Sequence, residues 1–206
     1  MIMKTQSNAV KKTSKPLSLA PRERVLEVAE NLFSQHGYAA IKMRDIADAL
    51  GVRQASLYYH APEGKAQLFF EATKQSLLRH KSGLEQTIAA AEPDVHAQLL
   101  AAARWSLSQP QVDFNRLMGT DTDSLSKSQV RELGEMMEAA LFRPIEKIFT
   151  GARKRGEIKI KNSETMAGTF LTVLQAVHHS HRYTQVPKDV IAAEIIGMLL
   201  NGLYPR

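Results

Sequence analysis

Apolar residues recur at every third or fourth position through most of the chain after residue 20, and this helical spacing limits the fold more than any other feature. A clear example ends at Gly37 and contains Val25, Val28, Ala29, Leu32 and Phe33. No stretch of useful length alternates apolar with polar residues, since residues 157–161 do so but are too few to build a sheet. The sequence therefore predicts an all-α protein.

Three short helices are expected near the N-terminus. The first begins at Pro21, whose missing N–H costs nothing in a first helical turn, and it ends before Gly37. The second spans about residues 43–50 and is followed by Gly51, and the third spans about residues 54–60. Two short helices joined by a glycine-containing turn indicate a helix-turn-helix unit.

The rest of the chain is predicted to form longer helices. The first spans residues 65 to about 91 and would be about 40 Å long, enough to connect two domains. Others are expected at about residues 94–107, 127–154, 163–183 and 188–203. Residues 108–126 contain Pro110, Gly119 and several Ser, Thr and Asp residues, and are expected to be irregular.

Composition excludes several classes of protein. The chain has no cysteine, which rules out disulfides, thiolate catalysis and cysteine metal sites. No apolar run approaches the roughly 18 residues that span a bilayer, and no secretory signal pattern follows the basic N-terminus, so a cytoplasmic protein is expected. The net charge is +6, and residues 1–65 hold ten basic but only six acidic residues. This bias favours a polyanionic partner.

The predicted third helix carries the clearest functional signal. If Leu57 faces the core, a rotation of about 100° per residue directs Ala55 and Tyr59 away from it. A small, polar and aromatic outward face suits the DNA major groove, where hydroxyl groups reach bases or phosphates. The residues predicted to contact DNA are Lys42, Arg44, Gln54, Ala55, Ser56, Tyr58, Tyr59, His60 and Lys65.

Different roles are expected within this set. Gln54 is placed to pair with adenine, and Arg44 to contact guanine or a phosphate. Lys65 begins the long helix, where its charge and the free N–H groups of the helix would bind a phosphate. His60 is expected mainly to pack, with one hydrogen bond to a phosphate.

The last two predicted helices are apolar over a wider surface than one core-facing side requires. A second subunit is expected to cover the excess, through an intermolecular four-helix bundle with isologous contacts. The residues predicted to form this dimer interface are Phe170, Leu174, Val177, Ile191, Ile195, Met198 and Leu199.

Three segments near the N-terminus form a combined motif. Residues 33–38 read FSQHGY, residues 43–52 read MRDIADALGV, and residues 56–60 read SLYYH before the segment 65–69. With these segments, residues 21–70 resemble the N-terminal domain of TetR-family transcriptional repressors. The resemblance implies an all-α homodimer that binds a palindromic DNA operator and releases it when the C-terminal domain receives a small molecule. Ile41 and Lys42 stand where the family usually has Thr or Ser, and Lys42 offers a phosphate its charge instead.

A domain organisation follows from this resemblance. Residues 1–20 are predicted to be a flexible basic arm, either a solvated tail or an additional DNA contact. Residues 21–66 would form the helix-turn-helix DNA-binding domain, and residues 67–206 a helical effector-binding and dimerisation domain. Aromatic and Met side chains of the central helices fill cores more often than pockets, but those predicted to line the effector pocket are Trp105, Phe114, Met118, Met136, Met137 and Phe142.

Other interpretations are less favoured. His178, His179 and His181 lie within one helical turn, but without a cysteine or a carboxylate in register we expect packing and no metal or cofactor. No nucleophile–base pair and no phosphate-binding glycine loop indicate an enzyme. The alternative function is a DNA-associated protein-interaction module with a filled C-terminal core and no small-molecule effector.

Overall fold

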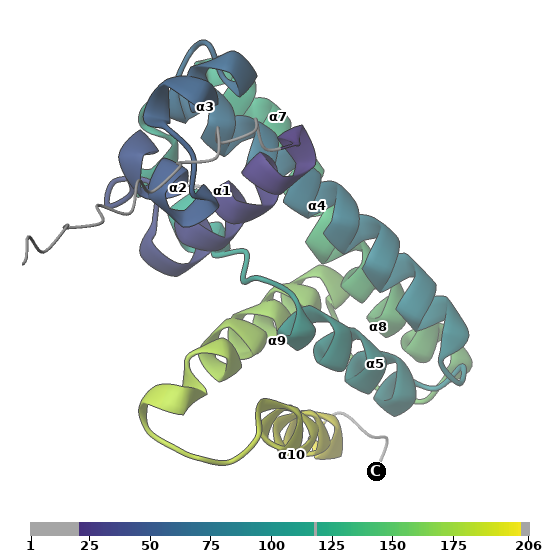
Figure 1. Cartoon of the computed structure of the whole chain (residues 1–206). Helices are drawn as coiled ribbons and strands as arrows, with labels where there is room; N and C mark the ends of the chain where they lie inside the picture. Colours follow the sequence, from purple (N-terminus) through teal and green to yellow (C-terminus); the bar gives the residue numbers. More distant parts are fainter. Residues whose placement is uncertain (1–20, 118, 203–206) are drawn as a thin grey trace, which may run out of the picture.

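The computed structural model describes residues 21–117 and 119–202, and every regular element within them is helical. The predicted all-α fold is therefore confirmed. The predicted N-terminal arm, residues 1–20, and Met118 lie outside the described residues. Among the residues that are described, no helix is both long and apolar enough to cross a bilayer. Figure 1 shows the first three helices at one end of an elongated molecule and the last helix at the other.

The N-terminal unit consists of α1 (Arg22–His36), α2 (Met43–Leu50) and α3 (Gln54–His60). These bounds agree with the sequence prediction. Gly37 ends α1 with a φ of 82°, a backbone conformation that residues with a Cβ adopt only at a cost. Phe33, Ile46 and Leu57 are buried at the centre of this unit, one from each helix. The three helices therefore share one small core.

The long helix α4 (Lys65–Ala90) packs against both α1 and α5, and so joins the N-terminal unit to the rest of the chain. Arg79 of α4 forms an ion pair with Glu30 of α1, with Nη1 3.0 Å from Oε2. Glu30 is only 8% exposed, and a buried carboxylate requires such a partner. This pair fixes α1 along α4.

The C-terminal part packs around buried side chains of several helices, among them Leu99, Ile145 and Phe149. Helix α5 contacts α4 and α10, and α8 contacts α9. The elements in chain order are α5 (Val95–Ser108), α6 (Phe114–Leu117), the 3₁₀ turn η1 (Thr120–Thr122), α7 (Lys127–Met137), the π turn η2 (Glu138–Phe142), α8 (Arg143–Arg155), α9 (Ser163–His178), the 3₁₀ turn η3 (Ser180–Arg182) and α10 (Lys188–Asn201).

Two of the predicted helices differ from those observed. The helix expected over residues 127–154 is divided into α7, η2 and α8, because the Arg143 N–H bonds to the Glu138 carbonyl five residues earlier. Pro144 follows directly, and in a regular helix its ring would clash with the carbonyl four residues before it. The wider π turn relieves that clash. The helix expected over residues 163–183 ends at His178 and is followed by η3.

Candidate nucleic-acid interface

The turn between α2 and α3 is built around Gly51. Its left-handed conformation, with φ 68° and ψ 30°, lets its N–H bond back to the carbonyls of Ala47 and Asp48, which ends α2. The Val52 N–H also bonds to the Ala47 carbonyl, at 3.0 Å. Leu57, only 1% exposed, then anchors α3 in the core of the unit. This geometry decides which side of α3 faces outwards.

The outward side of α3 carries large side chains that no other part of the described chain covers. Tyr59 is 77% exposed and Tyr58 is 45% exposed. Gln54 and Ala55 are exposed beside them, and Ser56 is half-buried. Aromatic rings that a folded domain leaves in water often mark a binding surface. An exposed helix face with a small residue such as Ala55 at its centre can approach the major groove closely.

Basic side chains border this face. Lys42 precedes α2 and Arg44 lies in its first turn, and both are exposed. Arg44 Nε lies 3.6 Å from Asp48 Oδ2, an exposed ion pair that costs little to break. Asp45 accepts the Lys42 N–H at 2.7 Å, so a carboxylate caps α2 although the hydroxyl cap is missing. The sequence prediction omitted Arg53, which is also exposed, although a basic residue directly before α3 was the available signal.

Lys65 makes internal contacts that the sequence prediction did not include. Its Nζ donates to the carbonyls of Tyr38 and Ile41, each at 2.9 Å, and lies 3.8 Å from the centre of the Tyr38 ring. Burial lowers the pKa of the Lys65 ammonium, and the nearby Asp121 carboxylate opposes this shift. Two of its three donors are used inside the protein. Lys65 thus holds the connection between α1 and α2 against α4, and its phosphate contact stays a prediction.

His60 is half-buried, in keeping with the packing role expected of it. Its ring meets that of Tyr59 edge to face, with 5.8 Å between the ring centres. His60 Nε2 is buried and has no hydrogen-bond partner among the described residues. A phosphate cannot reach Nε2 in this arrangement, and a phosphate contact through the other ring nitrogen stays a prediction.

Comparison with known proteins gives this domain a family. Residues 25–72, which include α2, the turn, α3 and the start of α4, match the model of the family described as bacterial regulatory proteins, tetR family. Residues 25–72 therefore resemble a DNA-regulatory domain of the tetR family. The protein named "Probable acrEF/envCD operon repressor" of Escherichia coli K12 is 35% identical over 88 residues, which are 43% of this chain and 40% of the repressor. The chain thus spans about two-fifths of the curated relative it matches. The family description names regulatory proteins, and the name of this relative describes a repressor.

Solved structures are similar to this chain over most of its fold. A transcriptional regulator from Saccharomonospora viridis in complex with choline has a TM-score of 0.68 at 17% identity, over 90% of this chain and 98% of its own. AibR in complex with isovaleryl coenzyme A and operator DNA has a TM-score of 0.69 at 18% identity, over 86% of this chain and 96% of its own. At such identities the likeness concerns the fold alone.

The side chains predicted to line an effector pocket do not gather around one cavity. Phe114 borders a small cavity of about 40 Å³ that also touches α4, α5, η2 and α9. Met137 and Phe142 instead border a broad concavity formed by α7, η2, α8 and α9, of about 1170 Å³. Phe114 and Phe142 meet edge to face, 5.7 Å between ring centres, and so lie between the two spaces.

The other members of that predicted set pack or lie outside the described residues. Trp105 is edge-on to His80 of α4, with 5.2 Å between ring centres. Met136 is partly buried against the hydrophobic core. Neither borders the small cavity or the broad concavity. Met118 is not described, so its predicted role is neither supported nor corrected.

The small cavity has no ionised side chain in its lining. Its polar members are Gln111, Gln175, Ser106 and two histidines, His80 and His178, and the others are apolar. Burial lowers the pKa of His178 to about 4, and the positive charge of Lys188 adds to the shift. Burial also lowers the pKa of His80, which is 3% exposed. Both rings are therefore neutral at pH 7.

The histidines near the end of α9 form no metal site within the described residues, where no group of three metal-binding side chains occurs. His179 Nδ1 lies 3.0 Å from the Gln175 carbonyl oxygen and is used in that contact. The side chain of His181 lies outside what the structure describes.

The neutral state of His178 gives a prediction for stability against pH. The folded pKa of about 4 lies below the ordinary value of 6.5, so in this range the unfolded chain binds a proton that the folded chain does not. Stability is full above pH 6.5 and falls towards pH 4, by about 2 kcal/mol at about pH 5. We expect urea unfolding to show this loss of stability, and we expect the His178→Gln variant to lose less.

His96→Gln, on the exposed face of α5, is the control and should keep the wild-type slope of the free energy of unfolding against pH. An unchanged slope in His178→Gln would contradict the prediction.

The dimer face predicted on α9 needs correction. Phe170, Leu174 and Val177 are at most 4% exposed in the single chain, because this side of α9 faces the core of the chain itself. Side chains already buried there cannot be covered by a second subunit. The prediction identified a real apolar stripe but assigned it to the wrong neighbour.

The outer face of α10 is apolar and uncovered. Met198 is 75% exposed and Val190 is 42% exposed. Ile191, Ile195 and Leu199, which the sequence also predicted for the interface, are half-buried beside them. This face carries one charged residue between its apolar positions, Glu194.

The outer face of α9 is made of small side chains that the sequence prediction did not use. Thr165, Thr169, Thr172 and Ala176 are exposed there. The hydroxyls of Thr169 and Thr172 donate to the carbonyls four residues earlier, at 2.9 and 2.8 Å. Their hydrogen bonds are satisfied within the helix, so methyl groups are left to face outwards. Such a face allows another helix to pack closely.

Proposed function

We propose that this protein is a ligand-responsive transcriptional repressor that binds a palindromic DNA operator as a homodimer and is released by a small-molecule effector. The observation that carries the proposal is the exposed face of α3 on a tetR-family domain, with Tyr58 and Tyr59 in solvent. Two relatives support it by their names: the E. coli protein is an operon repressor, and AibR was solved with operator DNA and a small molecule.

In this proposal the two parts of the chain have separate tasks. Residues 21–66 bind DNA, with α3 in the major groove and Lys42, Arg44 and Arg53 near the phosphates. Residues 67–206 bind the effector and form the dimer. A cytoplasmic location, where the operator DNA would be, belongs to the same proposal.

The proposed homodimer forms through the outer faces of α9 and α10. A helix that leaves several large apolar side chains in water gains free energy when a partner covers them, and the exposed Met198 and Val190 are such side chains. Two copies would place two α3 helices about 34 to 36 Å apart, one turn of DNA, when they bind successive major grooves. A two-fold dimer then matches a palindromic site.

One observation favours the alternative function, a protein-interaction module without an effector. The cavity at Phe114 holds about 40 Å³, whereas pockets for small organic ligands are commonly of the order of 300 Å³ or more. An effector bound in this cavity would therefore require its walls to move. A thermal shift in the presence of an uncharged small molecule would support the effector, and the absence of any shift across a broad compound set would support the module.

The DNA-binding part of the proposal is tested by selection from a random duplex library. We expect the full chain to enrich a palindromic duplex, and fluorescence anisotropy to show saturation at two chains per duplex. Enrichment of no sequence, or saturation at one chain per duplex, would contradict a dimeric operator-binding protein.

Replacing one exposed ring gives a specific prediction for that duplex. Tyr59→Ala should raise the Kd at least about fivefold, because a groove contact of this kind contributes about 1 to 3 kcal/mol. Tyr183→Ala is a matched control, since Tyr183 is 73% exposed but lies after α9, outside the N-terminal unit. It should change the Kd by less than about twofold. Equal effects of the two variants would refute the assigned face of α3.

A further inference from the structure

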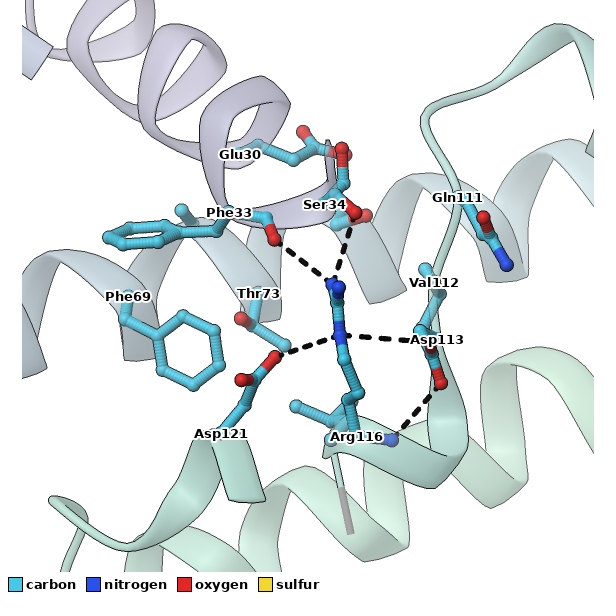
Figure 2. A pocket seen from close by; sticks show the side chains of 13 residues that line it. Glu30, Phe33, Ser34, Phe69, Thr73, Gln111, Val112, Asp113, Arg116 and Asp121 are labelled. Carbon is cyan, nitrogen blue, oxygen red and sulfur yellow. Dashed lines mark hydrogen bonds and ion pairs between the residues drawn. The ribbon is translucent and has the colours of Figure 1, made fainter. Parts of the chain in front are cut away.

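The segment between α5 and α7 touches both parts of the molecule. We call its residues 111–117 and 119–121 the strap, which includes α6 and most of η1. Figure 2 shows that it crosses beside the end of α1 and alongside α4. Its contacts with α1 and with the C-terminal helices are made by different side chains, so the strap has two functional sides.

One side of the strap holds the end of α1. Arg116 Nη2 donates to the carbonyls of Phe33 and Ser34, at 3.1 and 3.0 Å. These carbonyls lie in the last turn of α1, where a cation is favourable. The Phe33 carbonyl also accepts the Gly37 N–H, at 2.8 Å. Arg116 Nε also lies 3.3 Å from Asp121 Oδ2 and 3.6 Å from Asp113 Oδ2. The dashed lines in Figure 2 converge on this guanidinium.

Asp121 extends the same contact to the turn after α1. Its Oδ1 accepts the Tyr38 N–H at 3.1 Å, and the residue is only 7% exposed. A Cβ on Gly37 would lie 3.4 Å from that oxygen, so the backbone approaches closely here. Arg116 and Asp121 together form what we call the clamp, which grips the last turn of α1 and the first residues after it.

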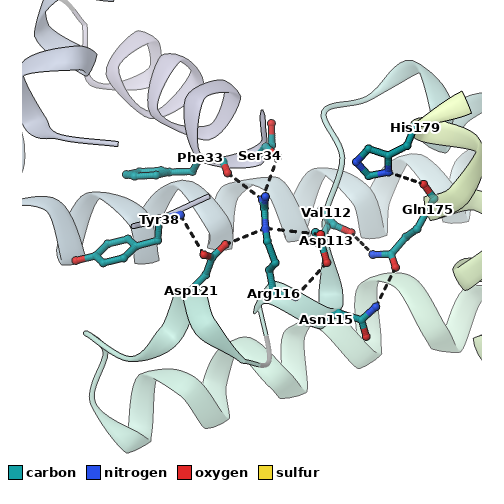
Figure 3. A network of polar contacts seen from close by, with 10 residues as sticks. All are labelled: Phe33, Ser34, Tyr38, Val112, Asp113, Asn115, Arg116, Asp121, Gln175 and His179. Atoms are coloured by element: carbon teal, nitrogen blue, oxygen red, sulfur yellow. Dashed lines mark hydrogen bonds and ion pairs between the residues drawn. The ribbon is translucent and has the colours of Figure 1, made fainter. Parts of the chain in front are cut away.

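The other side of the strap closes the small cavity. Gln111, Val112 and Phe114 form its wall on this side. Gln175 of α9 donates from Nε2 to the Val112 carbonyl at 3.2 Å, and its Oε1 accepts from Asn115 Nδ2 at 3.5 Å. Figure 3 shows two sets of polar contacts on the strap: one joins Tyr38, Asp121, Arg116 and Asp113, and the other joins Val112 and Asn115 to Gln175 and His179. One short segment therefore connects the N-terminal unit to α9.

The cavity wall also contains an unsatisfied polar group. Gln111 Nε2 is buried without a hydrogen-bond partner among the described residues, and an unpaired buried donor is costly. A ligand that accepts a hydrogen bond from it would remove that cost. A charged ligand would be disfavoured, since no ionised side chain lines the cavity to offset its lost hydration.

We propose that the strap couples ligand binding to the DNA-binding unit: an uncharged ligand with a hydrogen-bond acceptor displaces Gln111 and Val112, and this weakens the clamp on α1. The inference rests on the proposed function, because it gives the route by which an effector would act. The cavity is too small for most organic molecules while the strap is in place. Entry of a ligand therefore requires the strap to move, and Arg116 and Asp121 move with it.

The first test breaks the clamp and measures DNA binding. Arg116→Met keeps most of the side-chain length but removes both hydrogen bonds and both ion pairs. We expect its Kd for the selected duplex to rise at least about fivefold, a common size for coupling between sites. Because Arg116 touches no phosphate in this proposal, the dependence of log Kd on log salt should keep its wild-type slope. Arg116→Lys retains the charge and should recover part of the affinity.

The matched control for that test is Lys74→Met. Lys74 of α4 forms an ion pair with Glu132 of α7, so it also joins two separate elements, but neither belongs to the N-terminal unit. This variant should change the Kd by less than about twofold. An unchanged Kd in Arg116→Met would overturn the proposal, and a decrease of about one in its salt slope would show a direct phosphate contact instead.

The second test needs no DNA, and so separates failure of the strap from failure of the proposed function. Gln175→Leu removes a contact on the cavity side only, yet it should speed hydrogen exchange of the Tyr38 amide, which bonds to Asp121 on the other side. Gln86→Leu removes an exposed side-chain hydrogen bond to Ser82 within α4, and as the control it should leave that exchange unchanged. Equal Tyr38 exchange in wild type and Gln175→Leu would overturn the coupling, whether or not the protein binds an operator.

Discussion

Replacing Gly83 by alanine is expected to lower the free energy of unfolding by about 3 kcal/mol, the upper end of the usual cost of overpacking. A Cβ at this position would lie 1.9 Å from Cζ2 and 2.2 Å from Cε2 of Trp105. Neither the α4 backbone nor an indole ring can bend by such an amount. Trp105 also rests edge-on against His80, which limits its retreat. Urea denaturation of the full chain at pH 7 measures the loss.

Gly151→Ala is the control for this substitution. Gly151 lies within α8, and a Cβ there would meet only the far end of the flexible Arg155 side chain, 3.0 Å from Nη1. Alanine should therefore stabilise the helix by about 0.5 to 1 kcal/mol. If Gly83→Ala cost less than about 1 kcal/mol, Trp105 would be free to move, and the close packing of α4 on α5 would be contradicted.

The N-terminal helices could be predicted because local signals fix both their ends and their rotation. Gly37 and Gly51 stop α1 and α2 where the apolar spacing stops, and the observed bounds agree with the prediction. Leu57 is the single strongly apolar position in α3, so its burial determines that Ala55 and Tyr59 point outwards. The orientation of α3 about its own axis, set by Leu57, was therefore enough to predict its exposed face.

Contacts between distant segments could not be predicted in this way. Lys65 bonds to carbonyls 24 and 27 residues earlier, and Arg116 to carbonyls more than 80 residues earlier. The spacing of apolar residues along the chain gives no information about such contacts. Apolar spacing likewise showed that Phe170 and Leu174 share a side of α9, but not that the chain's own core would cover that side. The spacing of apolar residues shows which side of a helix is apolar, but not which element or subunit covers that side.

The division of the helix expected over residues 127–154 is a different case, because its cause was present in the sequence. Pro144 lies inside that stretch and cannot occupy the interior of a regular α-helix without losing a hydrogen bond. The chain keeps its helical course by widening one turn at η2 instead of stopping. Proline alone does not decide between a break and a π turn. Here the burial of Ala140 and Leu141, which lie within η2, favours continuation of the helix.

The largest effect on assembly is expected from a charge on the outer face of α10. In the proposed homodimer, Met198→Asp should raise the dissociation constant at least about 100-fold, because two-fold symmetry would place two unpaired carboxylates in one apolar interface. Met198 is 75% exposed in the single chain, so the substitution leaves the fold of each subunit intact. Sedimentation equilibrium measures the dissociation, and circular dichroism verifies the unchanged helix content. Binding to the selected palindrome should weaken with it, since one subunit contacts only half of the site.

Leu78→Asp provides the matched control, because Leu78 is also a large exposed side chain, at 58%, but lies on α4. This variant should remain dimeric and bind DNA as the wild type does. If Met198→Asp also stayed dimeric, the outer face of α10 would not be the interface. If it became monomeric but kept full affinity for the palindrome, then DNA binding would not depend on the dimer. A monomeric wild type would favour a protein-interaction module, in which the outer faces of α9 and α10 bind a different partner.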